Sequence, residues 1–262
     1  MESNRAGTFL PNIGVDAGDL TASALVVGDV ARVRAAADLL TDIREIGHNR
    51  EYLTVTGAFE GRRITVASHG VGASGANVCF MELLRGGVRT FIRAGTCGGL
   101  DPAIEDGDLI VATGAVREDA VTDHLMPAGY PAIADRGTVE SLARAALEER
   151  GSGVHVGLVV TDANFYAGVA EPRWKPYVGH GVLGVEMELA GLFVLAAMHG
   201  ARAGGLLTVD GNLVRDRAAD MSDYDPHRPV VEAGKAAMLR AAVRVLAGLD
   251  AGAGSAAGTD GA

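Results

Sequence analysis

One charged side chain, Arg93, lies inside an otherwise apolar stretch at residues 88–100, where β-branched residues give way to Gly, Thr and Cys. This pattern predicts a buried strand that feeds a tight loop, with Arg93 where the strand ends. A buried arginine must pair with a carboxylate or hold an anion. The neighbouring glycines and the Thr96 hydroxyl favour a small oxyanion held by backbone N–H groups. A structural ion pair with a distant carboxylate is the alternative.

Three acidic residues occupy positions where a carboxylate can do chemistry. Glu186 and Glu188 precede a segment with helical apolar spacing and almost no other charge before His199. They could compensate the helix dipole, but the scarcity of charge favours a carboxylate that accepts hydrogen bonds from a vicinal diol such as ribose. Asp210 follows a mostly apolar run and precedes Gly211. It marks either a turn or a catalytic acid at a strand end.

A Gly-x-Gly-x-x-Gly motif at residues 70–75 lies between a predicted strand and a predicted helix. It indicates a dinucleotide or a phosphate at the helix N-terminus. A dinucleotide fold needs an acid about 20 residues further on. Arg93 occupies that neighbourhood, so phosphate is favoured. Arg32 and Arg50 are isolated basic residues that, taken alone, indicate surface salt bridges. Phe165 follows a predicted strand and is either a core residue or a platform for a stacked base.

Alternating strands and helices must position these residues. Strands are predicted at residues 24–28, 52–59, 63–68, 108–116, 155–160, 203–209 and from residue 88 onward, and helices after a capping Asp29 and at 76–84, 139–147, 189–197 and 231–249. The strands around residues 60–61 form a hairpin. We therefore predict a single α/β domain at residues 21–249, with a mixed central β-sheet flanked by helices. An N-terminal arm at 1–20 precedes it, and a disordered tail at 250–262 follows it.

The 262-residue chain has a formal net charge of −10 and is 48% hydrophobic, an ordinary globular composition. The negative charge argues against nucleic acid or an anionic membrane as a partner. The two cysteines do not make a disulfide framework and fit a reducing compartment. The N-terminus lacks a signal-peptide core and no window reaches the length of a membrane span, which together predict a cytoplasmic protein.

Several short stretches, taken together in chain order, resemble the nucleoside phosphorylase family, which includes hexameric purine nucleoside phosphorylase and uridine phosphorylase. They are Val-Val-Gly-Asp at 26–29, Asn-Arg-Glu-Tyr at 49–52, Ser-His-Gly-Val-Gly at 68–72, Ile-Arg-Ala-Gly-Thr-Cys-Gly at 92–98, Ala-Val-Arg-Glu-Asp at 115–119, Val-Glu-Met-Glu-Leu at 185–189 and Val-Asp-Gly at 209–211. Each is weak alone, but the combination covers nearly the whole chain. The Val-Asp-Gly form is most similar to parasite-type purine nucleoside phosphorylases.

The resemblance implies phosphorolysis of purine nucleosides to free base and (deoxy)ribose 1-phosphate, with Asp210 as general acid to the base. The resemblance implies that phosphate contacts Gly28, Arg32, Arg93, Thr96 and a neighbouring subunit's Arg50. It implies that ribose contacts Glu186, Met187, Glu188 and Asn12. It implies that the base contacts Phe165 and Asp210. The resemblance also implies a homohexamer, a trimer of dimers with shared sites, that acts in purine salvage. Inorganic phosphate is the co-substrate, and neither a metal nor an organic cofactor is expected.

The chain departs from the family pattern in three places. Val30 replaces a proline in Gly-Asp-Pro-x-Arg. Asn12 replaces a histidine that reaches the 5′-hydroxyl of a neighbour's substrate. Asn12 either holds that hydroxyl through a water or marks a pocket relaxed toward changed 5′ groups, and the second is favoured. Val169 and Glu171 stand where uridine phosphorylases carry Gln and Arg, so pyrimidine recognition is predicted to be lost, although Arg173 lies two residues further on.

Rival functions remain open from the sequence alone. Within the fold they are a nucleosidase, which uses water, and a uridine phosphorylase. Outside it they are a non-catalytic nucleoside sensor and a nicotinamide-dependent oxidoreductase. The retained arginines argue against the nucleosidase, because a hydrolase has no anion to bind. Asp210 argues against the sensor, and Arg93 argues against the oxidoreductase.

Overall fold

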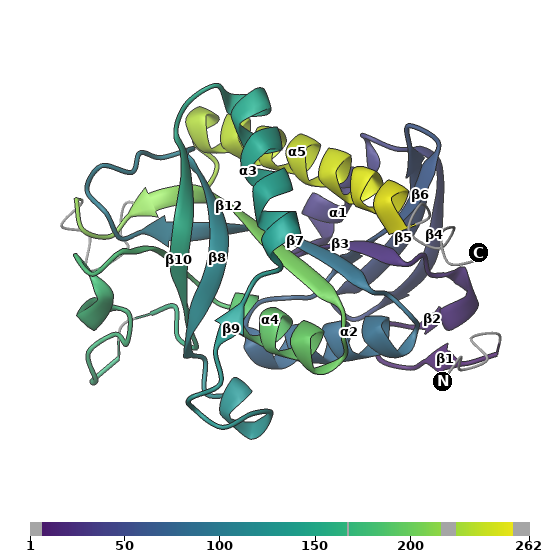
Figure 1. Cartoon of the computed structure of the whole chain (residues 1–262), viewed down its shortest axis with the longest axis horizontal. Coiled ribbons are helices and arrows are strands. Elements are labelled where there is room, and N and C mark those ends of the chain that lie inside the picture. The colour runs from purple at the N-terminus through teal and green to yellow at the C-terminus, as the bar shows by residue number, and fades with distance from the viewer. Residues whose placement is uncertain (1–6, 167, 216–223, 254–262) are drawn as a thin grey trace, which may run out of the picture.

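A mixed β-sheet with helices on both faces forms the body of the protein (Figure 1). The computed structural model describes residues 7–166, 168–215 and 224–253. Its strands are β1 (Phe9–Leu10), β2 (Val15–Asp16), β3 (Ser23–Val27), β4 (Thr41–Asn49), β5 (Tyr52–Phe59), β6 (Arg62–Ser68), β7 (Thr90–Gly99), β8 (Leu109–Glu118), β9 (Ala132–Ile133), β10 (Val154–Asp162), β11 (Val182–Glu186) and β12 (Arg202–Asn212). Its helices are α1 (Val30–Ala37), α2 (Ala73–Arg85), α3 (Arg136–Arg150), α4 (Leu189–Met198) and α5 (Pro229–Ala253).

The strand order places several carboxyl ends side by side. Within the described ranges the main sheet runs β11-β10-β8-β12-β7-β3-β6-β5-β4, with β9 beside β8. β6, β3, β7 and β12 are mutually parallel neighbours, whereas β12 is antiparallel to β8 and β5 is antiparallel to both β4 and β6. The predicted hairpin is therefore present as β5 and β6, with Glu60 and Gly61 at positive φ in its turn. The carboxyl ends of parallel strands are where α/β sheets bind ligands.

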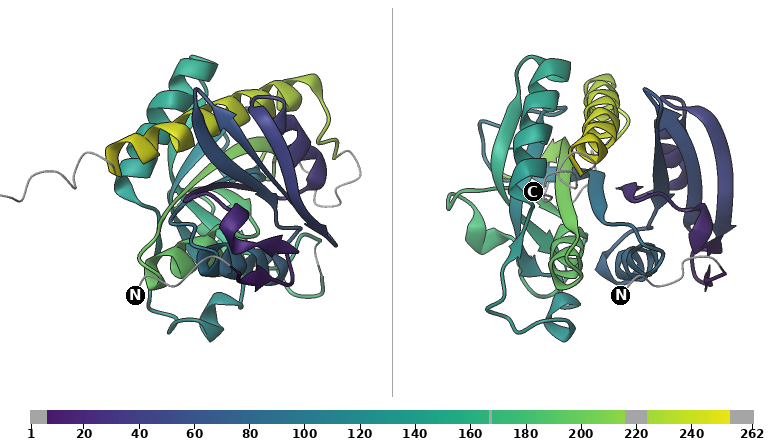
Figure 2. Two further views of the ribbon diagram at one scale, coloured as in Figure 1. Left: turned by 90° about the vertical axis from the view of Figure 1, so that its right-hand side faces the viewer. Right: turned by 45° about the vertical axis from the view of Figure 1, so that its right-hand side comes forward.

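Two apolar cores cover the two faces of the sheet. α1, α3 and α5 pack on one face, and α2 and α4 pack on the other (Figure 1, Figure 2). The first core includes Leu142, Met238 and Leu246, and the second includes Phe80 and Phe193. Full burial of such a side chain contributes about 1.5–3 kcal/mol. The two layers therefore hold the strand ends in fixed positions.

The helix ends follow signals that the sequence carries. Asp29 caps α1, as predicted, by accepting the backbone N–H of Arg32 at 2.8 Å. Asp135 caps α3 in the same way, and α3 ends at Gly151, whose φ is 76°. α5 begins at Pro229, a residue favoured in the first turn because its missing N–H would have no partner there.

Several strands differ from the prediction, among them β7, β4 and β11. β7 does not end at Arg93 but continues through the glycines to Gly99, because β12 and the last part of β11 give its backbone hydrogen-bonding partners. The sequence does not predict β4, whose mostly exposed residues show no buried alternation. It also does not predict the short β11, which alternates buried and half-buried residues around Gly184.

The described parts of both chain ends are ordered into elements. The predicted arm contains β1 and β2, with Leu10, Ile13 and Val15 buried in the core that includes α2. α5 extends to Ala253, past the predicted start of the tail at residue 250. Residues 1–6 of the predicted arm and 254–262 of the predicted tail lie outside the described residues.

Candidate active site

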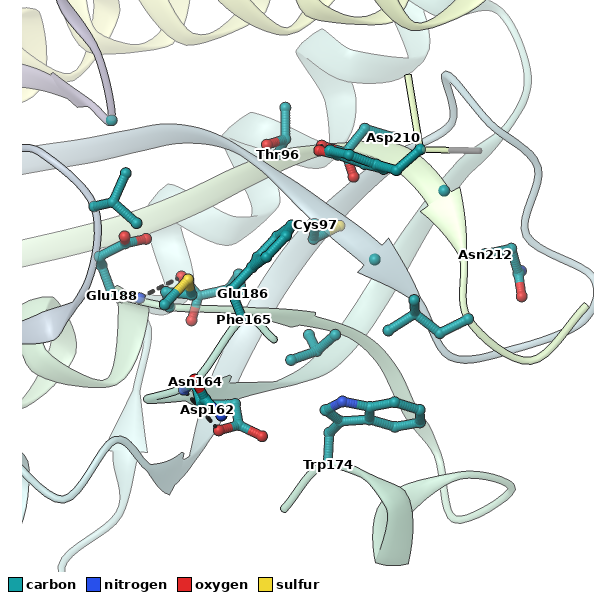
Figure 3. A pocket seen from close by; sticks show the side chains of 18 of the residues that line it. Thr96, Cys97, Asp162, Asn164, Phe165, Trp174, Glu186, Glu188, Asp210 and Asn212 are labelled. Atoms are coloured by element: carbon teal, nitrogen blue, oxygen red, sulfur yellow. Dashed lines mark hydrogen bonds between the residues drawn. The ribbon is translucent and has the colours of Figure 1, made fainter. Parts of the chain in front are cut away.

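A cavity of about 900 Å³ opens at the carboxyl ends of β3, β6, β7, β10, β11 and β12 (Figure 3). Strands far apart in the sequence meet there because of the parallel arrangement at the centre of the sheet. Most of the predicted site residues line the cavity: Gly28, Arg32, Arg93, Thr96, Phe165, Glu186, Met187, Glu188 and Asp210. The structure therefore brings together residues that the sequence could only propose one by one.

Arg93 is buried within β7, with only 4% of its surface exposed. Its guanidinium forms ion pairs with Glu188 and, at 3.3 Å, with Glu186. Within the described ranges its Nη1 atom has no hydrogen-bond partner. This is the atom that lies 3.3 Å from Glu186, so that contact is an ion pair without a hydrogen bond. The predicted ion pair is therefore present, and the anion-binding role of Arg93 stays a prediction.

Gly95 lets the Arg93 side chain lie close against the backbone of β7. A Cβ atom at Gly95 would lie 2.3 Å from Arg93 Nη1 and 2.8 Å from Cζ, well inside van der Waals contact. Residues two apart on a strand face the same side of the sheet. The Arg-Ala-Gly sequence therefore allows a close side-chain approach on a strand, and not the predicted anion-binding loop.

His69 orients Arg93 from the end of β6. Its ring is fully buried, with Nδ1 2.7 Å from the Gly70 carbonyl oxygen and Nε2 3.3 Å from Arg93 Nε. Because Arg93 Nε–H can only donate, His69 Nε2 accepts and Nδ1–H donates to Gly70. Burial, reinforced by the charge of Arg93, holds the pKa of His69 well below its usual range. The imidazole is therefore neutral and positions the guanidinium.

A second guanidinium reaches the cavity from the first turn of α1. The Arg32 side chain is 15% exposed and pairs with Asp29 at 3.1 Å. Burial lowers the pKa of Arg32, and the charge of Arg93 acts in the same direction, but an arginine stays charged in proteins. Gly28 and Thr96 line the cavity with it. Two arginines that repel each other beside a hydroxyl and a glycine form a site that a bound phosphate would stabilise.

Glu186 holds the beginning of α4. Its carboxylate accepts the backbone N–H of Glu188 at 2.8 Å and that of Leu189 at 2.9 Å, and it also accepts the Thr161 hydroxyl. These bonds satisfy N–H groups that a helix start leaves without partners. Glu186 therefore uses several of its acceptor positions within the protein to hold the start of α4, and its ribose contact stays a prediction.

Glu188 presents its carboxylate to the cavity next to Met187. It accepts the Gly72 backbone N–H at 2.7 Å and pairs with Arg93. The side chain is 5% exposed, and ionised carboxylates can accept several hydrogen bonds. Glu188 can therefore take donors from a sugar while its partners keep it charged.

Asp210 sits in a β-bulge where β12 runs beside β7. The parallel register shifts between Val209 and Gly211, which makes Asp210 the extra residue; such bulges re-aim side chains next to active sites. Asp210 is 5% exposed, and its Oδ2 accepts the Tyr224 hydroxyl at 2.7 Å. Burial raises the pKa of Asp210, partly opposed by hydrogen bonds from Tyr224 and Thr96. This is the strand-end position predicted for a catalytic acid.

The described ranges also bear on metal binding and on membrane insertion. No group of three or more His, Cys, Asp or Glu residues there is placed to hold a metal ion. No helix there combines the length and the apolar character needed to cross a membrane. Cys79 and Cys97 are free and buried, and burial raises the pKa of both thiols, so neither is an activated nucleophile.

A family model described as the phosphorylase superfamily matches residues 23–247. The chain belongs to the phosphorylase superfamily. It is 38% identical over 220 residues to guanosine phosphorylase of Halorubrum lacusprofundi, covering 83% of this chain and 90% of that protein. It is 34% identical over 227 residues to uridine phosphorylase of Treponema pallidum, covering 82% and 87%. The solved structure of purine nucleoside phosphorylase from Toxoplasma gondii with immucillin-H matches with a TM-score of 0.86 at 30% identity, covering 96% and 99%. The predicted family and fold class are confirmed.

Aromatic rings form one wall of the cavity in this phosphorylase (Figure 3). Phe165 is 46% exposed, and its ring centroid lies 5.9 Å from that of Tyr224. Trp174, from the segment between β10 and β11, lines the same space. These rings offer the apolar surface on which a planar base can stack.

The positions expected to read a pyrimidine lie outside the main cavity of this phosphorylase. Val169, Glu171 and Arg173 line a smaller adjoining hollow, which shares part of its lining with the main cavity. The Arg173 side chain is 67% exposed and pairs with Glu118 at 3.0 Å. In this structure Arg173 contacts Glu118 and does not line the main cavity, and the loss of pyrimidine recognition stays a prediction.

Two predicted site residues lie away from the cavity of their own chain. Arg50 is exposed in the turn between β4 and β5, with a φ of 55°. Asn12 is exposed, and both its backbone N–H and its side-chain amide donate to the buried Glu82 of α2. A residue that contacts substrate in a neighbouring subunit must lie on the surface of its own subunit. Arg50 and Asn12 meet that requirement, and their contacts with a neighbour's substrate stay a prediction.

Several residues around the cavity carry no role in the sequence analysis, among them His69, Asp162, Trp174 and Tyr224. His69 and Asp162 are polar residues at the ends of strands, and inspecting every predicted strand end would have found them. Tyr224 and Trp174 come from irregular segments, where residue spacing carries no signal.

Proposed function

We propose that this protein is a purine nucleoside phosphorylase, which uses inorganic phosphate to cleave a purine nucleoside into free base and (deoxy)ribose 1-phosphate. The observation that carries the proposal is one cavity lined by two buried arginines, the Glu188 carboxylate and a buried Asp210 of raised pKa. The relatives named guanosine phosphorylase and uridine phosphorylase support the reaction class and leave the identity of the base open.

Phosphate binds at the arginine side of the cavity. Guanidinium groups donate paired hydrogen bonds that match phosphate oxygens. Arg93 Nη1 pairs with Glu186 at 3.3 Å but makes no hydrogen bond within the described protein. Arg32, the Thr96 hydroxyl and the Gly28 backbone supply further donors. His69 is neutral, so it orients Arg93 without adding a charge of its own.

The sugar lies between phosphate and base, with its hydroxyls donating to Glu188 and its carbon face against Met187. A phosphate oxygen forms a bond to C1′ while the C1′–N9 bond breaks, and the bonding electron pair leaves with the base. Positive charge that develops on the sugar faces the phosphate anion. A preorganised charge of this kind supplies transition-state stabilisation in a water-poor site.

Asp210 donates a proton to N7 of the departing purine. A general acid must be protonated when it acts, and burial raises the pKa of this carboxyl. The Tyr224 hydrogen bond fixes its orientation. A pyrimidine has no N7, so an acid in this place supports a purine substrate.

The proposal also includes the assembly and the co-substrate. Arg50 and Asn12 reach a neighbouring subunit's site in a homohexamer, which explains why they lie on the surface here. Phosphate is the sole co-substrate, without a metal or an organic cofactor. Hydrolysis would leave the two buried arginines without an anion, which argues for phosphorolysis.

Product analysis tests this function. Inosine, guanosine, adenosine and uridine are incubated with and without phosphate, and base and sugar phosphate are separated by chromatography. We expect base release only with phosphate, and purines to react faster than uridine. Arg93→Met should abolish the phosphate effect, while Arg136→Met, at an arginine whose side chain is 92% exposed, serves as the matched control. Equal release without phosphate would mean a nucleosidase, and a faster reaction with uridine would refute the purine preference.

A further inference from the structure

Asp162 carries a buried oxygen that the described protein leaves unsatisfied. It is the last residue of β10 and is 3% exposed. Oδ1 accepts the Asn164 backbone N–H at 3.0 Å, whereas Oδ2 is buried and has no hydrogen-bond partner in the described ranges. Such an atom costs free energy unless something binds it.

The position of Asp162 points to a ligand of the main cavity. Asp162 lines that cavity together with Phe165 and Trp174, and all three also line the smaller adjoining hollow. Figure 3 shows Asp162 and Asp210 on opposite sides of the Phe165 ring. A planar molecule stacked on Phe165 therefore has one acid at each of two edges.

We propose that Asp162 accepts hydrogen bonds from the N1–H and 2-amino group of a 2-amino-6-oxopurine, so that the site selects guanine-type nucleosides. The inference rests on the proposed function, which puts N7 of the base at Asp210. N7 and the 2-amino group lie on opposite edges of a purine, as the two acids do on opposite sides of Phe165. A carboxylate has acceptors only, and its two oxygens match two adjacent N–H donors.

Other bases satisfy Asp162 less well. Hypoxanthine keeps N1–H but lacks the second donor. Adenine turns the N1 lone pair toward the carboxylate, and two acceptors repel. The expected order of affinity is therefore guanosine, then inosine, then adenosine.

Calorimetry in phosphate-free buffer measures this order without depending on turnover. Dissociation constants for guanosine, inosine and adenosine are determined for the wild type, Asp162→Asn and Asp162→Ala. Glu171→Gln, an exposed carboxylate of the adjoining loop that does not line the main cavity, is the matched control. In the wild type guanosine should bind about tenfold more tightly than inosine, the scale of a paired contact to a base edge. Both Asp162 variants should bring that ratio near one, and the control should keep it.

The outcomes separate this inference from the proposed function. A wild type that binds the three nucleosides equally would overturn it, even if phosphorolysis is verified. An Asp162→Asn protein that keeps its preference, or that loses affinity for all three by one factor, would also overturn it. If the alanine variant does not fold, the isosteric Asn variant and the wild-type series decide. Absence of phosphate dependence in turnover would refute the phosphorylase reaction and leave the binding order valid.

Discussion

Replacing Gly95 by alanine should impair phosphate binding without removing any charged group. The new Cβ would lie 2.3 Å from Arg93 Nη1 and 2.9 Å from Nη2. Restoring ordinary contact requires the guanidinium to move by about 1 Å. Gly95 has no positive φ, so the backbone itself accepts alanine. Moving the guanidinium disturbs the ion pairs of Arg93 with Glu186 and Glu188 and its hydrogen bond to His69.

The size of the effect follows from this displacement. A misplacement of about 1 Å in a positioning group can cost roughly 10²-fold in rate, equivalent to about 2.7 kcal/mol. A charged hydrogen bond contributes about 1.5–3 kcal/mol, which gives the same scale. We therefore expect kcat/KM for phosphate to fall about 10²-fold in Gly95→Ala, mainly through KM.

The assay varies phosphate at saturating inosine, and thermal unfolding verifies that the variant is folded. Gly248→Ala in α5 is the control, because a Cβ there meets nothing within 4 Å; helix propensity predicts a gain of up to about 1 kcal/mol in stability and unchanged kinetics. A folded Gly95→Ala protein whose KM for phosphate stays within about twofold of wild type would refute the link between Arg93 placement and phosphate affinity.

Three further predictions concern the acid, the assembly and the sugar. Asp210→Ala should slow inosine by about 10²–10⁴-fold but affect 7-methylguanosine much less, because that base leaves without a proton; equal losses would make Asp210 structural. Because burial raises the pKa of Asp210, its active acid form persists to higher pH than in an ordinary Asp, and kcat/KM for inosine should fall as the pH rises through that pKa, with no such fall in Asp210→Asn. Arg50→Ala mixed with Glu188→Ala should regain activity if sites are shared; no recovery after verified subunit exchange would contradict sharing. The wild type should discriminate inosine from 5′-deoxyinosine by less than about tenfold, and Asn12→His should sharpen this; a hundredfold rejection by the wild type would show that the hydroxyl is still recognised.

The sequence predicted strands and helices correctly where buried residues follow the spacing expected for that element. Apolar runs marked β3, β8, β10 and β12, and capping residues such as Asp29 and Gly151 marked helix ends. The predicted strand boundaries were wrong where a strand is held by other strands that are distant in the sequence. β7 continues through Gly95 because neighbouring strands pair with it, and glycine alone predicts a loop. β4 is a mostly exposed edge strand, so it leaves no periodic signal.

In the candidate site, too, some features could be predicted from the sequence and others could not. Arg93, Glu188 and Asp210 were found because a charged residue in an apolar context is conspicuous. The different tasks of Glu186 and Glu188 were not separable, since they depend on which carboxylate turns toward the start of α4. The free oxygen of Asp162 is likewise a property of three-dimensional packing.

The Arg93–Glu188 ion pair has a consequence for how two substrates enter one cavity. If phosphate and nucleoside bind as proposed, phosphate competes with Glu188 for the guanidinium, and the sugar hydroxyls compete with Arg93 for the carboxylate. Each substrate therefore loosens the pair that the other must displace. Linkage requires the two effects on affinity to be equal. We expect nucleoside and phosphate to bind with positive cooperativity, so that the order of their arrival is set by their concentrations and not by the fold.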